Sequence, residues 1–141
     1  MKKILFIIIG LSVGLMADFV RDGSTSIVTD TATGLQWQDD TTPISMTWQG
    51  AIDYCEALKL GGKSDWRLPN INELTSVVNV SVDSPSISNI FVNTVSDKYW
   101  SSTTLTQFTN NAFIVGFSFG YQSSNYAKTT SHYVRCVRAG Q

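Results

Sequence analysis

The stretch Tyr-Val-Arg-Cys-Val-Arg at residues 133–138 decides the fold of this chain, because it holds one of the two cysteines of the sequence. Alternation along this β-prone run puts Val134 and Cys136 on one face and the residues beside them on the other. We therefore predict a closing strand over residues 133–137. Its register would turn Cys136 toward the element that holds the second cysteine.

The second cysteine, Cys55, lies in a chain whose start has the pattern of a secretory signal. Residues 1–3 are Met-Lys-Lys, residues 4–15 are largely apolar, and Ala17 offers a small residue for cleavage. We therefore predict a signal peptide over residues 1–17 and a secreted, periplasmic or cell-surface location. In an oxidising compartment one disulfide is the simplest expectation, closing a loop of about 80 residues and adding roughly 4–5 kcal/mol of stability. A buried free thiol is the alternative.

Length and charge restrict the classes of protein to which the chain can belong. Removal of the leader would leave residues 18–141, which suits one domain with its own core. It would also remove two lysines, leaving eight basic against eleven acidic residues and a net charge of −3. This charge argues against nucleic-acid binding.

No later segment approaches the roughly 20 apolar residues of a membrane span, so we expect no span in the mature form. Lys128, Arg135 and Arg138 form the one basic cluster, which suits either a solvated strand face or a small anion site.

Two helices are predicted from capping residues and apolar spacing. Thr47 precedes an apolar stripe over residues 48–58, which predicts a helix that ends at the Gly-Gly pair of residues 61–62 and holds Cys55 on its inner face. A second helix is predicted to run to about Val78, because Asn-Ile-Asn-Glu at its start supplies a capping pair.

The remaining segments favour strands and loops. Residues 26–29 and 34–38 predict a hairpin in which Gly34 takes a positive φ. Residues 112–121 alternate between large, mostly aromatic side chains and smaller ones, which predicts one strand. Residues 79–98 are rich in Ser and Asn and predict a long surface loop, a candidate functional loop. Its isolated apolar residues would pin it to the core: Ile87, Ile90, Phe91 and Val95.

Several motifs, in order along the chain, resemble the C-terminal domain family of bacterial collagen-like adhesins. They are Gly-Leu-Gln-Trp at 34–37, the helix over 51–58, Asp-Trp-Arg-Leu-Pro-Asn at 65–70 with Glu-Leu at 73–74, Tyr-Trp-Ser-Ser-Thr at 99–103, and the stretch at 133–138. Together they extend over nearly all of residues 18–141.

This resemblance implies a C-type-lectin-like fold, distantly related to formylglycine-generating-enzyme-like domains. The fold class would be α+β, with two helices packed on small antiparallel sheets, paired N- and C-terminal strands, and a long loop region that forms the binding surface. A disulfide between the first helix and the last strand is also implied, and Cys55 and Cys136 match it. Collagen-like adhesins of the family are associated with sulfated polysaccharides and attachment. This chain has no Gly-X-Y tract, so avidity through a collagen stalk is not implied.

The inventory of reactive groups argues against an enzyme. The chain has one histidine, His132, for which we expect an exposed strand position, and two glutamates, Glu56 on a solvent-facing helix side and Glu73 in a cap. Cysteine-based copper chemistry of the formylglycine-generating branch is not transferred, because both cysteines would be oxidised. We predict no cofactor and no metal. Calcium is the alternative, through Asp39-Asp40 with Asp83 or Asp97, although no calcium-lectin motif occurs.

Recognition of a polar ligand is the function that the side chains favour. Amides, hydroxyls and aromatic rings suit a glycan, and a lysine suits its sulfate or carboxylate. We expect Tyr126 to lie in an exposed loop, and we expect the phenylalanines of residues 113–119 to lie in the core. An exported partner protein, or a structural periplasmic role, is the alternative. The predicted ligand-binding residues are Gln107, Asn110, Asn111, Gln122, Asn125, Tyr126 and Lys128, and the predicted structural ones are Trp37, Trp66, Leu68 and Trp100.

Overall fold

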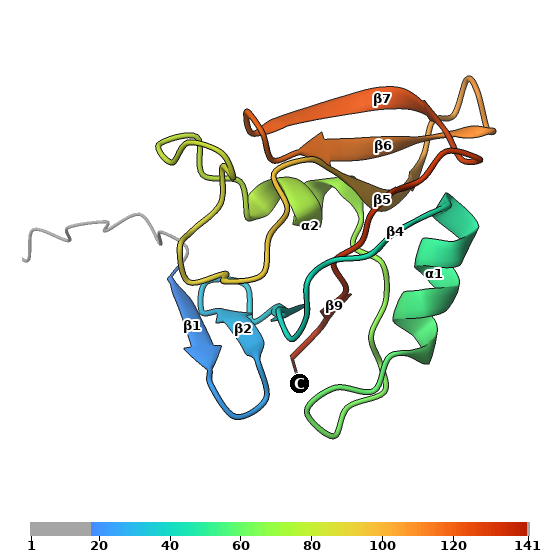
Figure 1. Cartoon of the computed structure of the whole chain (residues 1–141). Helices are drawn as coiled ribbons and strands as arrows, with labels where there is room; N and C mark the ends of the chain where they lie inside the picture. The colour runs from blue at the N-terminus through green and yellow to red at the C-terminus, as the bar shows by residue number, and fades with distance from the viewer. Residues whose placement is uncertain (1–17, 141) are drawn as a thin grey trace, which may run out of the picture.

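The computed structural model describes residues 18–140 and shows an α+β fold with two helices and two small sheets (Figure 1). The predicted signal peptide lies outside the described residues. Within them, no helix combines the length and apolar character that crossing a membrane requires. The strands are β1 (Phe19–Asp22), β2 (Ile27–Asp30), β3 (Gln36–Gln38), β4 (Ser45–Met46), β5 (Lys98–Thr104), β6 (Asn111–Gly116), β7 (Tyr121–Ala127), β8 (His132–Tyr133) and β9 (Val137–Arg138).

The first sheet is antiparallel and has the strand order β1-β2-β3-β9. The predicted hairpin is confirmed as β2 and β3, with Val28 opposite Trp37 and Gly34 at a φ of 75°. The last strand pairs with β3, where Val137 lies opposite Trp37, and β1 forms the far edge. The C-terminal strand β9 therefore joins this sheet by pairing with β3 of the hairpin rather than with the N-terminal strand β1.

The second sheet has five strands in the order β4-β8-β5-β6-β7, with β5 and β8 parallel and the other pairs antiparallel. The prediction of one strand over residues 112–121 is wrong. The strand β6 stops at Gly116, and Gly120, at a φ of 69°, closes a turn in which its N–H donates to the Gly116 carbonyl at 2.9 Å. Phe117 is buried in this turn, whereas Phe119 is 82% exposed and is not a core residue.

The predicted closing strand is divided between the two sheets. Residues 132–133 form β8 in the five-stranded sheet, residues 137–138 form β9 in the four-stranded sheet, and residues 134–136 connect them. The predicted face assignment holds through this crossing. Val134 and Cys136 belong to one hydrophobic cluster, while Val137 belongs to the other.

Both helices begin at the predicted caps. The helix α1 (Trp48–Ala57) has Thr47 as its N-cap and ends before the Gly-Gly pair. The helix α2 (Ile71–Ser76) has a complete capping box, in which Asn70 accepts the Glu73 N–H at 2.8 Å and Glu73 accepts the Asn70 N–H at 2.9 Å. Arg67 donates to both carboxylate oxygens of Glu73 at 2.7 Å, so the cap is also an ion pair.

The disulfide between Cys55 and Cys136 is present and joins α1 to the segment that crosses between the sheets. Both residues are fully buried, and the free-thiol alternative does not hold. Trp100 lies in the same cluster, and its indole N–H donates to the Met46 carbonyl at 2.9 Å. Trp37, Trp66, Leu68 and Trp100 are all buried.

Candidate functional site

Most of the predicted ligand-binding residues meet at one end of the β6–β7 hairpin. Gln107 and Asn110 lie in the β5–β6 turn, and Asn111 begins β6 opposite Ala127. The Lys128 N–H donates to the Asn110 carbonyl at 2.9 Å. The side-chain amide of Asn111 donates to that of Asn125 across the two strands. We name this end the polar tip: residues 107–111, Asn125 and Lys128.

Gln122 does not belong to the polar tip. It lies near the other end of β7, where its side-chain oxygen accepts a hydrogen bond from Thr75 of α2 at 3.3 Å. Gln122 and Asn125 lie apart along the extended strand β7 although they are close in sequence. They therefore do not belong to one site.

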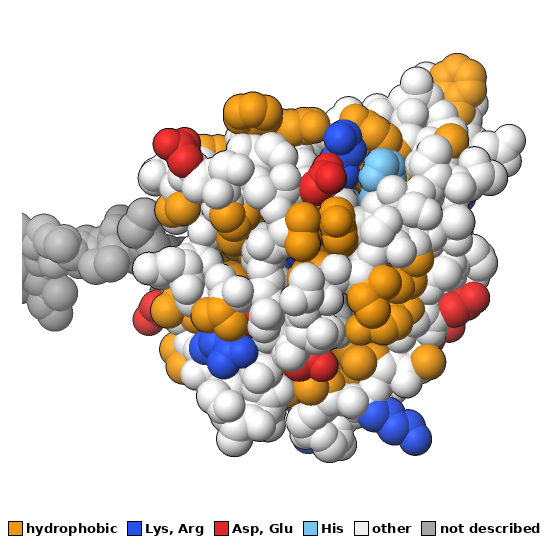
Figure 2. Space-filling model, in the orientation of Figure 1, with side chains coloured by type: hydrophobic (Ala, Val, Ile, Leu, Met, Phe, Trp, Pro, Cys, Tyr) orange, Lys and Arg blue, Asp and Glu red, His pale blue; other side chains and the backbone are white. Residues whose placement is uncertain are grey.

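Phe108 is exposed over 61% of its surface in the β5–β6 turn, and it is not among the predicted site residues. The turn projects at the upper right of Figure 1, and Figure 2 shows a hydrophobic side chain standing out at the same corner. Gln107 and Asn110 beside it are also exposed. The sequence contains an indication of this exposure, because Phe108 is the single apolar residue of the run Thr-Gln-Phe-Thr-Asn-Asn.

Lys128 stands at the base of the polar tip in a fixed position. Its ammonium donates to the Thr104 hydroxyl at 2.9 Å and lies 3.9 Å from the centre of the Trp48 ring. A cation over an aromatic face is held by the ring quadrupole. The charge is therefore oriented by the protein before any ligand arrives.

Tyr126 and His132 differ from their predicted positions. Tyr126 is on β7 rather than in a loop, and it is half-buried. His132 is also half-buried rather than exposed, with its ring centre 5.2 Å from Tyr126 and 4.7 Å from Trp100. This burial, together with the positive charge of Lys98, lowers the pKa of His132, while Asp97 opposes the shift. The contacts among these rings explain why neither side chain is fully exposed.

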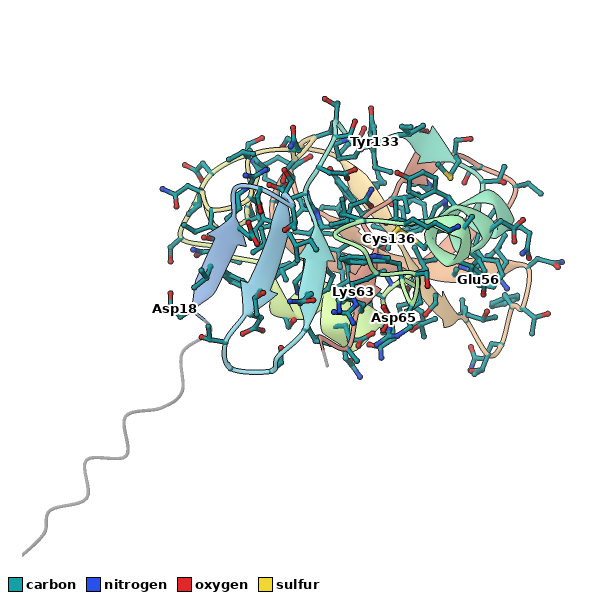
Figure 3. The ribbon with its side chains drawn as sticks, turned by 90° about the horizontal axis from the view of Figure 1, so that it is seen from below. Asp18, Glu56, Lys63, Asp65, Tyr133 and Cys136 are labelled. Carbon is teal, nitrogen blue, oxygen red and sulfur yellow. A yellow bond between two sulfur atoms is a disulfide. The ribbon has the colours of Figure 1, made fainter. Side chains whose placement is uncertain are left out.

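The predicted basic cluster does not form, because Arg135 and Arg138 are buried at 2% and 3% exposure. Arg138 donates to Asp65 at 2.6 and 3.1 Å, and Asp65 lies on the lower face of the molecule (Figure 3). Arg138 also donates to the Gln36 side chain. The prediction that Arg135 and Arg138 lie on a solvated strand face is therefore wrong, and so is the alternative that they form an anion site with Lys128. These cations instead neutralise carboxylates that are distant in the sequence.

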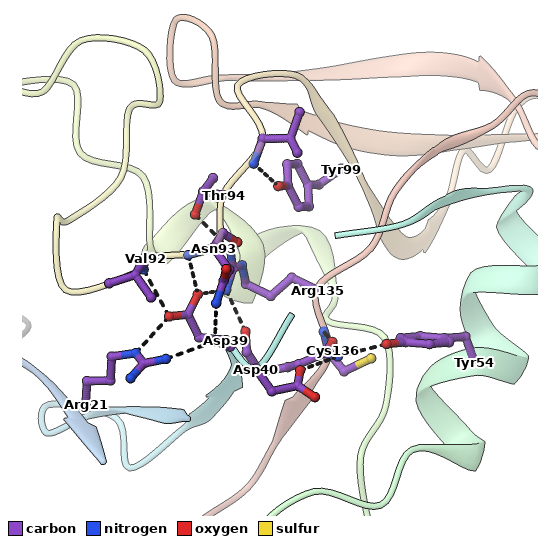
Figure 4. Close-up of polar contacts among 12 residues, drawn as sticks. Arg21, Asp39, Asp40, Tyr54, Val92, Asn93, Thr94, Tyr99, Arg135 and Cys136 are labelled. Atoms are coloured by element: carbon purple, nitrogen blue, oxygen red, sulfur yellow. Dashed lines mark hydrogen bonds and ion pairs between the residues drawn. The ribbon is translucent and has the colours of Figure 1, made fainter. Parts of the chain in front are cut away.

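Asp39 and Arg135 form a buried ion pair at 3.0 Å, which we name the junction (Figure 4). Asp39 also accepts from Arg21 at 3.0 Å and from the backbone N–H groups of Val92 and Asn93 at 3.0 and 3.1 Å. The Asp39 carboxylate therefore holds the long loop to the first sheet. With the bond from Arg135, the two oxygens of this carboxylate accept four hydrogen bonds from the protein.

Arg135 completes the attachment of the long loop. Its guanidinium donates to the Asn93 carbonyl at 2.6 Å, to the Thr94 hydroxyl at 2.8 Å and to the Gln38 carbonyl, and it lies 4.9 Å from the centre of the Phe91 ring. The predicted loop over residues 79–98 is confirmed up to the start of β5, because it contains no helix or strand and its apolar anchors Ile87 and Phe91 are buried.

The long loop encloses an open hollow of about 310 Å³. Its walls are formed by Val82, Pro85, Ile87, Ser88, Asn89, Phe91, Val92 and Thr94. No charged side chain is among these residues. The hollow differs in chemistry from the polar tip, which contains amides, one cation and an exposed ring.

Groups suited to metal binding are not gathered in the described part of the chain. Residues 18–140 contain no cluster of three or more His, Cys, Asp or Glu side chains placed to hold a metal ion. Glu56 is exposed on α1, as predicted. Glu73 is engaged by Arg67, which is the main cause of its lowered pKa.

The chain matches the model of the Lcl C-terminal domain family over residues 26–138. A comparison with curated proteins finds no match. The matched region runs from β2 to the end of β9 and includes the disulfide, the junction, the long loop and the polar tip.

Proposed function

The chain belongs to the Lcl C-terminal domain family, and from this premise we propose that it is a non-catalytic module that binds carbohydrate and serves in adhesion. The proposed location is secreted, periplasmic or at the cell surface, which the buried disulfide supports. The α+β arrangement with a helix-to-terminal-segment disulfide supports the C-type-lectin-like relationship that the motifs implied.

One observation supports the saccharide most directly: an exposed aromatic ring in the same turn as two exposed amides. Phe108 is 61% exposed, and Gln107 and Asn110 flank it in the same turn. A sugar ring presents C–H groups on its face and hydroxyls at its rim. An aromatic face covers the former, and amides, which both donate and accept, satisfy the latter. The polar tip offers both.

Lys128 adds a preference for anionic saccharides such as sulfated polysaccharides. Its ammonium lies on the Trp48 ring and uses one of its three N–H donors on Thr104. The remaining donors can meet a sulfate or carboxylate without further ordering of the side chain. We propose no metal in this contact, because the tip residues are amides, hydroxyls and a cation rather than carboxylates.

The absence of catalysis is part of the proposal. In the described residues the two cysteines are joined, Glu73 is paired with Arg67, and His132 lies between aromatic rings. A general base must reach a substrate proton within hydrogen-bond distance. None of these groups stands free beside another reactive group.

The test is a titration of the purified protein against a panel of neutral and sulfated polysaccharides, with calcium and with a chelator. We expect saturable binding that calcium does not alter. Phe108→Ala should weaken it about tenfold, which corresponds to the roughly 1.4 kcal/mol of one aromatic contact. Lys128→Gln should weaken binding of the sulfated ligands more than of the neutral ones.

Phe119→Ala is the matched control, because Phe119 is an exposed phenylalanine in the turn at the opposite end of β6. It should bind like the original protein. Absence of saturable binding across the panel would refute the proposal. Equal losses in both phenylalanine variants would remove the site from the polar tip.

A further inference from the structure

We propose that a hollow on the lower side of the molecule is a second binding site, which receives a small zwitterion with one ammonium and one carboxylate group, as in a free amino acid. We name it the lower hollow. It measures about 210 Å³, below the roughly 300–1,000 Å³ of typical ligand pockets, so its ligand is small. The residues that line it are Asp22, Thr25, Ile27, Thr29, Gln36, Gly61 and Lys63. None of them belongs to the polar tip, so the proposal is independent of the carbohydrate site.

Two turns on the lower side of the molecule form the walls of the lower hollow (Figure 1). Asp22 and Thr25 come from the β1–β2 connection, and Gly61 and Lys63 come from the turn that follows α1. The strands β2 and β3 supply the remaining residues. Among the lining residues only Ile27 is buried, so the hollow is accessible to a ligand.

Two opposite charges line the lower hollow without pairing with each other. Asp22 and Lys63 both belong to its lining, yet no N···O contact within 4.0 Å joins their side chains. A ligand that carries an anionic group and a cationic group can meet both charges at once. The separation of the two walls therefore favours a zwitterion.

The Lys63 ammonium is available because the carboxylate on the same face is already engaged. Both oxygens of Asp65 accept from Arg138, at 2.6 and 3.1 Å (Figure 3). Lys63 forms no side-chain hydrogen bond or ion pair within residues 18–140. Its backbone is held by two hydrogen bonds with Leu60, at 3.0 and 3.1 Å, across the turn Gly61–Gly62, in which both glycines have a positive φ. The wall that carries the cation is therefore ordered before a ligand binds.

The Asp22 carboxylate is oriented by its own turn and keeps one oxygen for a ligand. Its Oδ1 accepts from the Ser24 N–H at 2.8 Å, from the Ser24 hydroxyl at 2.7 Å and from the Thr25 N–H at 3.4 Å. These bonds, first of all that of the Ser24 hydroxyl, lower the pKa of Asp22, so the group is anionic at neutral pH. Its Oδ2 accepts no hydrogen bond within the described residues and can receive an ammonium.

The neutral groups of the lining suit the uncharged part of such a ligand. The Thr29 hydroxyl accepts from the Gln36 amide at 3.3 Å, so its own hydrogen can be donated to a ligand carboxylate. Ile27 is 6% exposed and supplies an apolar floor. A Cβ at Gly61 would come within 2.5 Å of the Ile27 Cδ1, so glycine lets this wall lie directly against the floor.

Other classes of ligand fit the lower hollow less well. No aromatic residue lines it, so a sugar ring has no face on which to stack. Its single carboxylate is too few for calcium, which takes roughly six to eight oxygens. A simple anion would be repelled by Asp22, and a simple cation would be repelled by Lys63. A ligand with both charges gains from both residues.

The experiment follows backbone amide resonances of the isotope-labelled protein by NMR during titration with L-valine. Isovalerate, which lacks the amino group, and isobutylamine, which lacks the carboxylate, are the matched comparison ligands. We expect saturable shifts with L-valine in the segments that line the hollow, which are residues 22–29, Gln36 and residues 61–63. Affinities for the comparison ligands should be lower by about tenfold or more, because each of them is repelled by one wall.

Lys63→Gln and Asp22→Asn should each weaken binding of L-valine by about tenfold or more. Lys63→Gln should also remove the preference for L-valine over isobutylamine, which a general loss of structure would not do. Asparagine at position 22 keeps the acceptor oxygen for Ser24, so the turn is retained. Lys59→Gln and Asp83→Asn are the matched controls, because both residues are exposed and neither lines the hollow. They should bind L-valine like the original protein.

Phe108→Ala should also bind L-valine normally, so failure of this proposal and failure of the carbohydrate proposal are distinguishable. The proposal is overturned by an absence of saturable shifts with L-valine or by shifts outside the lining segments. Equal affinity of the original protein for L-valine and either comparison ligand would overturn it as well, and so would equal losses in the control variants.

Discussion

The junction is a buried ion pair and the polar tip is a group of mostly exposed amides with one cation, so the two polar regions differ sharply in exposure. Asp39 and Arg135 are 1% and 2% exposed, whereas Phe108 is 61% exposed among exposed amides. In the junction every charge has a protein partner. At the tip, the groups of Gln107 and Asn110 face solvent.

The difference shows that the polar groups that hold the fold are buried against protein partners, whereas those available to a ligand are exposed. A buried charge that loses its partner is strongly destabilising, because the remaining charge stays in a medium of low polarity. An exposed amide that is removed is replaced by water. Mutations should therefore divide into those that unfold the protein and those that leave its stability unchanged.

Asp39→Asn should have the largest effect on stability. It keeps the shape of the side chain but leaves Arg135 and Arg21 without the carboxylate that pairs with both. We expect a loss of about 3–5 kcal/mol in the free energy of unfolding, measured by chemical denaturation. Asp40→Asn is the control, because Asp40 is the exposed neighbour and should change stability by less than about 0.5 kcal/mol. Similar effects at both positions would contradict the distinction by burial.

Glu73→Gln should have an intermediate effect, because the Arg67–Glu73 pair is only partly buried. The side chains of Arg67 and Glu73 are 45% and 16% exposed. Glutamine keeps the acceptor of the capping box but loses the charge, so we expect a loss of about 1 kcal/mol by the same measurement. Glu56→Gln on the open side of α1 should be neutral. A loss as large as that of Asp39→Asn would mean that the Arg67–Glu73 pair contributes as much to stability as the junction, against the expectation from its partial exposure.

The pH dependence of stability should reveal His132, which lies between the two extremes of exposure. Its pKa is lowered in the folded state from an ordinary value of 6.5, so the unfolded chain binds its proton first as the pH falls. Stability from this group is complete above about pH 6.5 and decreases below it, until the folded-state pKa is reached. Thermal melts from pH 7.5 to pH 5 should show this decrease, and His132→Gln should flatten it. An unchanged slope in the variant would assign the decrease to other groups.

Phe108→Ala should have the smallest effect on stability. Its side chain packs on little, so we expect a change within about 0.5 kcal/mol in the free energy of unfolding while carbohydrate binding falls. Thermal shift and titration on the same sample compare the two properties. A marked loss of stability would mean that the tip supports the fold, and the comparison with the junction would then fail.

The local elements of the fold were predictable from the sequence because their causes are local. The Thr47 cap, the capping box of Asn70 and Glu73, and the turn at Gly34 each depend on residues a few positions apart. The disulfide was predictable because two cysteines in a chain with an export pattern leave few alternatives.

The remaining features depend on partners distant in the sequence. Arg135 and Arg138 looked like surface cations, because Asp39 and Asp65 lie 96 and 73 positions away. The closing strand looked continuous because alternation does not show that a chain passes from one sheet to another. Alternation likewise continued through the turn after Gly116, since Phe117 and Phe119 keep the period while the backbone reverses. Phe108 was missed because an aromatic residue is more often buried than exposed.

The strand order of the first sheet has a mechanical consequence. Asp18 adjoins β1 at one edge of this sheet, and β9 forms the other edge, so a pull applied at Asp18 and Arg138 crosses β1, β2, β3 and β9 in turn. The polar tip, in the other sheet, stands outside this line of force. If β9 peeled away from β3, the load would pass next to the covalent Cys136 bridge, which ties the strained end to α1. The domain would then bear tension through one sheet without distorting the polar tip, the surface proposed to bind carbohydrate.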